Sequence, residues 1–174
     1  MLAIASKLYG NATPAAEDLP RFCIVADEVT EEELARLFRG ADAFVLPTRG
    51  EGWGLPTMQA MSMGLPVIST NWGGSVDFMT RDTAFLLELE SVDEVPLNNP
   101  YGHRAGKKWA TPSIPHLIFL MEYVFREREH AAAVGRRARS HIVSNFDDFE
   151  VVRVVDKRIQ EIAFSLRSHS SWFG

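Results

Sequence analysis

One stretch of the sequence, Ala41–Ser75, constrains the fold of this chain more than any other. It begins with a short apolar run, Ala43–Leu46, which a proline stops and which is typical of a buried parallel strand. A turn with three glycines follows at Thr48–Gly54, and Pro56 then stands where the first turn of a helix accepts proline. Gly64 marks the end of that helix, and another apolar run follows it. The stretch predicts a strand–loop–helix–strand unit, with its loop at the carboxyl end of a strand, where open α/β sheets bind ligands.

The rest of the chain fits the same α/β plan. Apolar runs predict five strands, at Leu2–Ala5, Phe22–Ala26, Ala43–Leu46, Leu65–Ser69 and Ala84–Leu87. A capping box, Thr30 with Glu33, predicts a helix over Val29–Arg39. The inner face of that helix would be formed by Leu34, Leu37 and Phe38. We therefore expect a Rossmann-like parallel sheet with flanking helices.

The final third of the chain reads as helical. Its first helix has an apolar stripe at Ile114, Leu117, Ile118, Met121, Val124 and Phe125. Two more helices are expected at about Glu129–Ser144 and Phe149–Ser165. The segment before them, Glu88–Pro112, has low periodicity and several prolines and glycines, so it predicts an irregular excursion. Basic residues in this excursion could meet phosphate or simply form a solvated loop: Arg104, Lys107 and Lys108.

The glycine-rich turn indicates what the site could bind. Gly50, Gly52 and Gly54 let backbone N–H groups approach a ligand closely, and the helix N-terminus just beyond suits phosphate. Glu51 would repel phosphate, so its useful partners are hydroxyl groups. Together these groups suit a sugar phosphate or a sugar nucleotide. The alternative is a glycine-rich turn in which Glu51 is only a charge at a helix end, because such turns alone are weak signals.

The same residues carry a family resemblance. The chain has Glu51, then the run Gly52–Pro56, then Gln59, between the flanks ADAFVLP and AMSMGLPVISTNWGG. This segment resembles the donor-binding half of retaining family-4 glycosyltransferases of the GT-B architecture. In that family an acidic residue, a Gly-aromatic-Gly-Leu/Arg-Pro run and a second acidic residue form the sugar-nucleotide signature. The resemblance is dense over Ala41–Ser75 and weaker over most of Arg21–Ala163.

The resemblance implies a glycosyltransferase of the hexosyltransferase type and gives roles to individual residues. Glu51 would contact the donor sugar at the catalytic site through a hydroxyl group. The donor-binding set would be Gly50, Glu51, Gly52, Trp53, Gly54, Leu55 and Gln59. Gln59 would meet the nucleotide ribose, where the family usually has Glu; an amide keeps one accepting oxygen and loses the charge, so we expect a weaker contact. The donor would be a nucleotide sugar, with no cofactor and no metal implied.

Composition excludes several classes of function. A length of 174 residues with 46% hydrophobic content fits one globular domain, and a net charge of -5 argues against a nucleic-acid surface. No apolar run approaches the roughly 20 residues that span a bilayer. Met1–Ala5 lacks the basic flank of a secretory signal, so a cytoplasmic location is expected. Cys23, the only cysteine, lies in an apolar run and is expected to be a buried, inert thiol.

The resemblance also implies missing parts. The GT-B architecture pairs two Rossmann-like domains, and this chain is too short to hold the N-terminal acceptor domain as well. Nothing before Leu2 supplies the first βα unit, which in the family carries basic residues that clamp the diphosphate. We therefore expect residues 1–165 to form a partial donor-binding domain, followed by a polar tail at 166–174. By itself this fragment is expected to be inactive.

Three functions remain open on these grounds. The first is a retaining glycosyltransferase whose donor-binding domain is represented here. The second is a non-catalytic binding or interaction module derived from such an enzyme, which Gln59 and the missing clamp favour. The third is another GT-B-like enzyme, such as a sugar-nucleotide epimerase, since a fold does not fix a reaction. The residue sequence of the glycine-rich loop, Glu51–Pro56, favours the transferase over the epimerase.

Overall fold

The structure is a computed structural model that describes residues 23–96 and 106–170, with side chains described as far as residue 166. The chain divides into two compact units, Met1–Thr30 and Glu31–Gly174. All the helices and strands described below belong to the second unit. The strand expected at Leu2–Ala5 lies outside the described residues.

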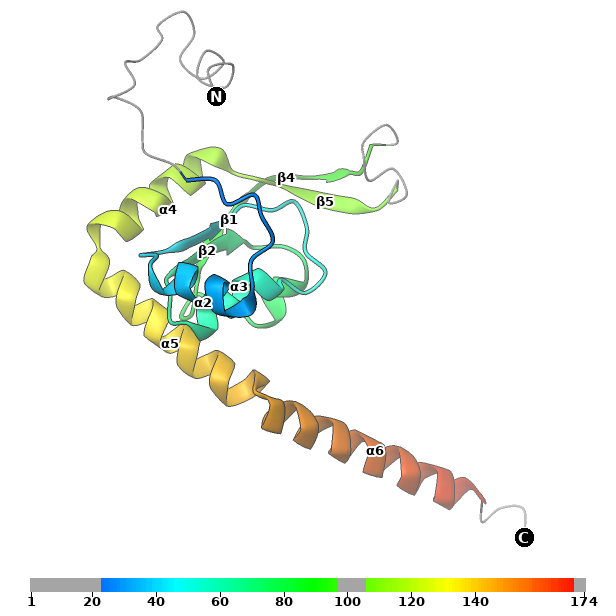
Figure 1. Cartoon of the computed structure of the whole chain (residues 1–174). Helices are drawn as coiled ribbons and strands as arrows, with labels where there is room; N and C mark the ends of the chain where they lie inside the picture. Colours follow the sequence, from blue (N-terminus) through cyan, green and yellow to red (C-terminus); the bar gives the residue numbers. More distant parts are fainter. Residues whose placement is uncertain (1–22, 97–105, 171–174) are drawn as a thin grey trace, which may run out of the picture. The chain divides into compact units, whose positions relative to one another are not determined.

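A parallel sheet of three strands forms the centre of the second unit (Figure 1). Its strands are β1 (Phe44–Leu46), β2 (Val67–Thr70) and β3 (Phe85–Leu87), in the order β1-β2-β3. Ile68 pairs with Val45 on one side and with Phe85 on the other. Every residue of β2 is buried, as expected for a central parallel strand. These strands confirm three of the five predicted ones.

Helices cover both faces of this sheet. The elements are α2 (Glu31–Arg39), α3 (Leu55–Ser62), the 3-10 helix η1 (Gly74–Asp77), α4 (Ile114–Arg126), α5 (Arg128–Phe146) and α6 (Asp148–Ser170). Val67 belongs to a core cluster with α2, α3 and α5, whereas its neighbour Ile68 packs with α4 and the start of α5. Because successive side chains of a strand point to opposite faces, the two clusters lie on opposite sides of the sheet. The chain is thus an α/β fold with a Rossmann-like layering.

The junction of α3 and β2 depends on two glycines. Gly64 follows α3 with a φ of 80°, a left-handed conformation that ends the helix as the sequence predicts. Gly135, in the middle of α5, faces this turn so closely that a Cβ atom there would overlap the carbonyl oxygen of Gly64. The side chain of Arg139, one turn along α5, donates a hydrogen bond to the carbonyl of Ser62. The backbone of the turn after α3 therefore packs directly on the backbone of α5.

The strand predicted at Phe22–Ala26 is wrong over its described part. Cys23 to Ala26 have no strand structure, and the side chains of Ile24 and Val25 are 76% and 53% exposed. Cys23 is a free, exposed thiol, so the buried thiol expected from the sequence is also wrong. An apolar run becomes a strand only when another strand pairs with it, and in the described ranges β1, β2 and β3 pair only among themselves.

The irregular excursion predicted at Glu88–Pro112 is wrong as well. It contains an antiparallel ribbon of β4 (Leu89–Glu94) and β5 (Lys108–Pro112), with a register irregularity between Leu89 and Ser91. Most residues of β4 are exposed, and β5 buries only Ala110 and Pro112. A solvent-exposed ribbon needs few apolar residues, so it lacks the alternation that identifies a half-buried strand.

Asp93 joins the two strands of this ribbon. Its carboxylate accepts hydrogen bonds from the hydroxyls of Ser91, at 2.5 Å, and Thr111, at 3.0 Å. These two hydrogen bonds lower the pKa of Asp93 below its usual value, since they stabilise the charged form. The carboxylate therefore adds a polar cross-strand link to the backbone pairing.

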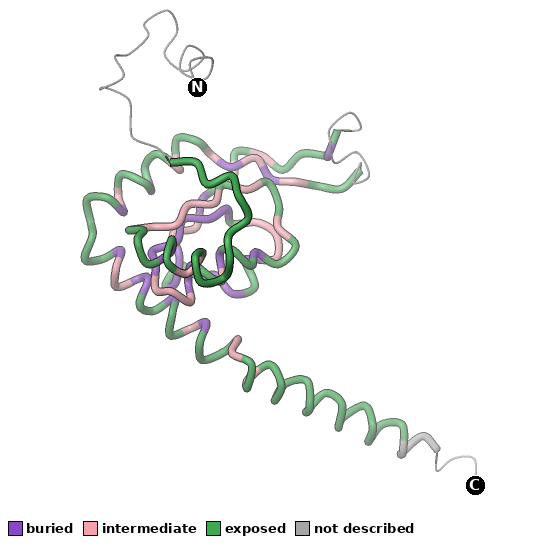
Figure 2. The backbone as a smooth tube through the Cα atoms, viewed as in Figure 1, coloured by how far each residue is buried: buried purple, intermediate pink, exposed green. Residues whose placement is uncertain are grey.

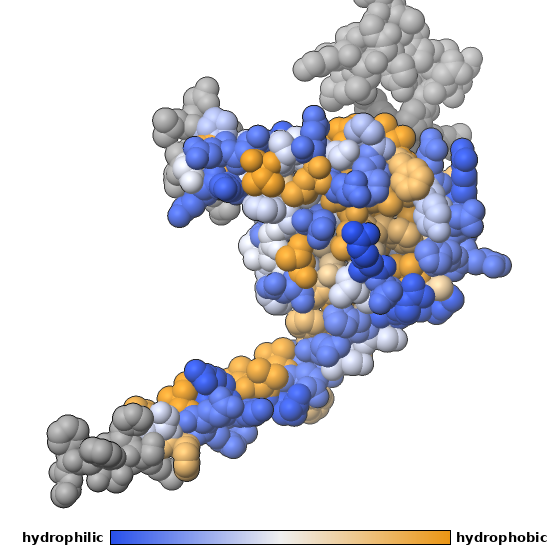
Figure 3. Space-filling model, turned by 180° about the vertical axis from the view of Figure 1, so that it is seen from behind, coloured by the Kyte–Doolittle hydropathy of each residue, from blue (hydrophilic) through white to orange (hydrophobic). Residues whose placement is uncertain are grey.

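The helices of the final third form as predicted, but their apolar faces are only partly buried. In α4, Leu120 and Val124 are buried, whereas four residues of the predicted stripe are exposed: Ile114, Ile118, Met121 and Phe125. In α2, Phe38 is buried as predicted, whereas Leu37 is exposed, against the prediction. The residues of α6 are exposed from Val151 to Leu166, as Figure 2 shows. Figure 3 shows apolar patches along this helix.

Replacing Gly135 by alanine should destabilise the fold. The added methyl group has no space against the Gly64 carbonyl, so α5 must move away from α3. Overpacking of this kind costs about 1–3 kcal/mol in the free energy of unfolding. Urea denaturation would measure the loss. Gly40→Ala is a matched control, because a Cβ atom there meets only ordinary contacts, the nearest at 3.6 Å. Equal stability of the two variants would contradict the assigned role of Gly135.

The pKa of Asp93 should depend on its cross-strand partner. Because this pKa is lowered in the folded state, Asp93 stabilises the ribbon above about pH 4 and loses that contribution as the pH falls through the lowered value. We expect Thr111→Val to raise the pKa of Asp93 toward its usual value by removing one hydrogen bond. Carbon NMR titration of the carboxyl group would measure both proteins. An identical pKa in the variant would show that Thr111 makes no contribution.

Candidate functional site

The glycine-rich turn at Thr48–Gly54 lies between β1 and α3, at the carboxyl end of β1. The hydroxyl of Thr48 folds the start of the turn by accepting from the amide of Gly50 at 3.2 Å and donating to its carbonyl at 3.1 Å. Gly54 precedes α3 with a φ of 89°, which only glycine adopts readily. Pro56 follows in the first turn of the helix, as predicted.

The loop after β2 packs against this turn and fixes its backbone. The amide of Gly74 donates to the carbonyl of Glu51 at 3.0 Å, which links the loop after β2 to the loop after β1. A Cβ atom at Gly74 would overlap the carbonyl oxygen of Gly52, and one at Gly73 would come within 2.9 Å of the carbonyl oxygen of Glu51. The two loops therefore pack backbone to backbone. This contact fixes the main chain of Glu51 and leaves its side chain half-buried.

Glu51 lies at a cavity of about 680 Å³ between its own loop and the β4–β5 ribbon. The loop and the ribbon contribute eight lining residues: Thr48, Arg49, Gly50, Glu51, Val95, Lys107, Lys108 and Trp109. The cavity thus combines one carboxylate with three cationic side chains and an indole ring. A carboxylate accepts hydrogen bonds from hydroxyl groups, and the cations can hold an anionic group.

Arg49 ties the Glu51 loop to the ribbon. Its carbonyl accepts from the amide of Ala110 at 2.8 Å, and its guanidinium donates to the hydroxyl of Thr111 at 2.9 Å. The same guanidinium stacks over the ring of Trp109, 4.8 Å from the ring centroid. The hydroxyl of Thr111 donates in turn to the carboxylate of Asp93. One side chain therefore links the loop that follows β1 to both strands of a ribbon that starts about forty residues later.

The cavity includes only two of the residues predicted from the sequence, Gly50 and Glu51. Trp53 is 40% exposed and its ring lies 5.7 Å from that of Phe78, so it packs on the protein instead. Leu55 is 60% exposed, on the first turn of α3. The remaining predicted residues also stand outside the lining: Gly52 and Gln59 are exposed, and Gly54 is buried.

Sequence reasoning missed part of this site. The sequence gives no signal that Arg49, Val95 and Trp109 contribute, whereas it leaves Lys107 and Lys108 open as phosphate contacts or as part of a solvated loop. Arg49 lies within the predicted glycine-rich turn, but its side-chain partners come from the ribbon, for which the sequence gives no strand signal. Arg104 lies outside the described residues.

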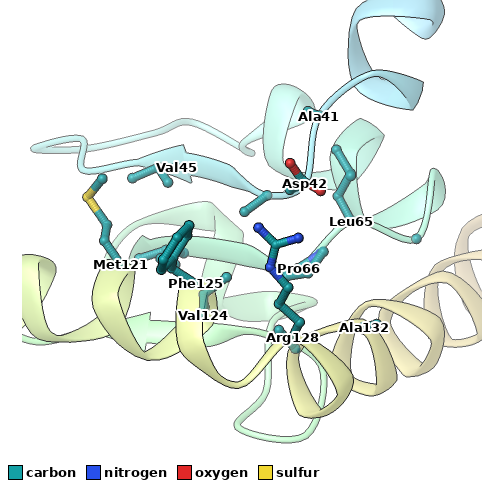
Figure 4. Close-up of a pocket in the computed structure, with 14 residues that line it drawn as sticks. Ala41, Asp42, Val45, Leu65, Pro66, Met121, Val124, Phe125, Arg128 and Ala132 are labelled. Atoms are coloured by element: carbon teal, nitrogen blue, oxygen red, sulfur yellow. The ribbon is translucent and has the colours of Figure 1, made fainter. Parts of the chain in front are cut away.

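A second cavity, of about 480 Å³, has a different chemistry. It lies beside β1, between the sheet and the junction of α4 and α5, and its lining includes Val45, Met121 and Phe125 (Figure 4). Arg128 points toward Asp42 at one end of it, and the other labelled residues are apolar (Figure 4). This cavity contains none of the residues predicted for the site. We therefore take the cavity at Glu51 as the candidate functional site.

In the ranges that the structure describes, no group of three or more His, Cys, Asp or Glu side chains is arranged to hold a metal ion. Among the described helices, none is both long enough and apolar enough to span a membrane.

Comparisons with known proteins show which proteins this chain is similar to. The chain is 31% identical over 90 residues to sulfoquinovosyl transferase SQD2 of Arabidopsis thaliana, a match that covers 47% of this chain and 18% of the relative. It is 46% identical over 67 residues to O-antigen chain mannosyltransferase B of Escherichia coli, covering 38% of this chain and 17% of the relative. The matches to these curated relatives span less than a fifth of their lengths.

A solved structure supports the fold. Sucrose-phosphate synthase from Thermosynechococcus elongatus superposes on this chain with a TM-score of 0.56 and 18% identity, over 80% of this chain and 29% of that one. At this identity the likeness concerns the fold alone, which corresponds to one half of a GT-B architecture. The family model described as "Glycosyl transferases group 1" matches residues 6–95. Because this match covers more than half of the 174 residues, the chain belongs to the group 1 glycosyltransferases.

Proposed function

We propose that the cavity at Glu51 binds a nucleotide sugar, and that the complete protein transfers the sugar to an acceptor with retention of the anomeric configuration. The observation that carries this proposal is the half-buried carboxylate of Glu51 in a cavity with three cations, at the carboxyl end of a parallel strand. A nucleotide sugar presents hydroxyl groups and a diphosphate close together. The cavity offers a partner to each of these groups.

Glu51 is suited to orient the sugar. Its backbone is fixed by Gly74, so a hydroxyl bound to its carboxylate would be held in a defined position. In the transfer step the bond between the anomeric carbon and a phosphate oxygen breaks, and the acceptor hydroxyl forms the new bond on the same face and gives its proton to the departing diphosphate. Negative charge then grows on the departing diphosphate. Cations beside the site would stabilise this charge in the transition state.

We propose that the acceptor is bound by another domain of the complete protein. The curated relatives are more than five times as long as the parts that match this chain. The α6 helix exposes an apolar stripe at Val152, Val155, Ile159 and Ile162. Exposed apolar surface of this kind is typical of a contact with a further domain. On this view residues 1–165 are part of a donor-binding domain, and the described fragment alone does not turn over.

A non-catalytic binding module is the second candidate function, and Gln59 favours it. This side chain is exposed on α3 and does not line the cavity. It also lacks the charge that the family usually places at this position for the ribose. A protein that holds a sugar nucleotide weakly, or holds only part of it, would tolerate this loss.

Glu51→Gln should weaken the binding of a nucleotide sugar more than that of the free nucleoside diphosphate. The charge-assisted hydrogen bond to the sugar hydroxyl is worth about 1.5–3 kcal/mol, and the free nucleotide has no such hydroxyl at this position. Isothermal titration calorimetry would measure both affinities. Glu122→Gln, an exposed carboxylate on α4, serves as the control. Equal losses for the two ligands would count against the assignment of Glu51.

Gln59→Glu should tighten the binding of a nucleoside diphosphate by roughly 1 kcal/mol if one hydrogen bond to the ribose is regained. The comparison uses the matching 2′,3′-dideoxy nucleotide, which lacks both ribose hydroxyls and should gain nothing from the substitution. An unchanged affinity for the ordinary nucleotide would place the ribose elsewhere and would favour the non-catalytic module.

A further inference from the structure

We propose that the β4–β5 ribbon supplies the phosphate-binding wall of this cavity, with Lys107 and Lys108 holding a phosphate or diphosphate group while Glu51 meets hydroxyls. The identity of the ligand as a glycosyl donor rests on the proposed function. The phosphate site itself does not. The phosphate could belong to the donor or to a phosphorylated acceptor, and the experiment below separates these sources.

The charge of the cavity differs from that of the whole chain. The chain has 18 Lys and Arg residues against 23 Asp and Glu residues, a net charge of -5. The cavity lining reverses this balance, with Arg49, Lys107 and Lys108 against Glu51 alone. Cations gathered at a concave site raise the local concentration of anionic ligands. The ligand of this cavity should therefore carry negative charge as well as hydroxyl groups.

The two lysines remain available for a ligand. Neither Lys107 nor Lys108 forms an ion pair with any residue that the structure describes. Glu94 stands opposite Lys108 in the strand register, but the two side chains are not joined by an ion pair. Arg49, in contrast, already donates to Thr111 and stacks on Trp109. Arg49 therefore acts as the anchor of the wall, and the lysines provide its free charges.

The lysines are held in position relative to Glu51. The carbonyl of Lys107 accepts from the amide of Val95 at 2.8 Å, which closes the ribbon at the cavity. Two residues beyond Lys108, the amide of Ala110 donates to the carbonyl of Arg49 at 2.8 Å. The lysine backbone and the Glu51 loop are thus parts of one hydrogen-bonded assembly. Cations on such a frame bind an anion at a smaller ordering cost than cations on a free loop.

Two backbone amides near Glu51 are already engaged within the protein. The amide of Gly50, which the sequence suggested as a phosphate donor, already donates to the hydroxyl of Thr48. The amide of Gly74 in the neighbouring loop donates to the carbonyl of Glu51. Both amides are used in holding the loop together. The side chains of Lys107 and Lys108 can make the phosphate contacts that these two amides do not make.

Calorimetry with inorganic pyrophosphate tests the wall without any sugar or base. We expect the full chain to bind pyrophosphate, and Lys107→Ala and Lys108→Ala each to weaken binding about tenfold, because each removes a charge-assisted hydrogen bond. Lys107→Arg should restore most of the affinity. Lys157→Ala, which removes the same charge from exposed α6, is the matched control and should leave binding unchanged. Circular dichroism of each variant establishes that it is folded.

The outcomes separate this inference from the proposed function. No pyrophosphate binding by the wild-type chain, no loss in the double variant that carries both Lys107→Ala and Lys108→Ala, or an equal loss in Lys157→Ala would overturn the inference. If the lysine effects hold but Glu51→Gln does not distinguish a nucleotide sugar from its nucleotide, the phosphate wall stands and the donor assignment fails. Tighter binding of a nucleoside diphosphate than of pyrophosphate, lost in the double variant, assigns the phosphate to the donor. Lysine-dependent binding of a sugar monophosphate alone assigns it to the acceptor.

Discussion

The backbone contact between two loops is the constraint on which the candidate site depends. The loop after β1 carries Glu51, and the loop after β2 carries Gly73 and Gly74, which approach so closely that side chains at either glycine would overlap Glu51 or Gly52. Both loops leave the same edge of the parallel sheet, because the carboxyl ends of parallel strands lie together. The position of Glu51 is therefore set by the register of β1 and β2. The sheet, which contains no site residue, determines where the carboxylate lies.

Much of this architecture can be predicted from local sequence signals. The strands β1, β2 and β3, the helix start at Pro56 and its end at Gly64 all follow from apolar runs bounded by residues with restricted or unusual backbone preferences. Prediction from local sequence fails where an element forms only because another segment pairs with it or packs on it. The run at Cys23 is apolar but unpaired in the described sheet, whereas β4 and β5 are polar and yet pair with each other. In α4, periodicity indicates an apolar face, but the packing buries Leu120 and leaves Phe125 exposed.

The candidate site likewise has one part that local sequence signals predict and another part that they do not. The place of Gly50 and Glu51 in a turn after β1 is predictable, because a carboxylate in a glycine-rich turn after a strand is a local pattern. The opposite wall of the cavity comes from residues about sixty positions later, and its anchor is the contact of Arg49 with Thr111. No spacing rule connects an arginine to a threonine across that distance. The assignment of Gly52 to Leu55 to the donor site rests on the family resemblance and stays a prediction; these residues stand outside the lining of the cavity at Glu51.

The separation of opposite charges on two chain segments explains how one cavity can serve two parts of a ligand. If Glu51 and the lysines stood on the same short loop, they would form an ion pair and cancel each other's charge. Here the main chain of Glu51 is fixed by a backbone contact with Gly74, and the main chain of the two lysines is fixed by the pairing of the ribbon. The two walls are linked through Arg49, whose guanidinium is already engaged with Thr111 and Trp109. The anchor thus joins the walls without using the charges that a ligand would need, so hydroxyl and phosphate recognition can coexist within one cavity.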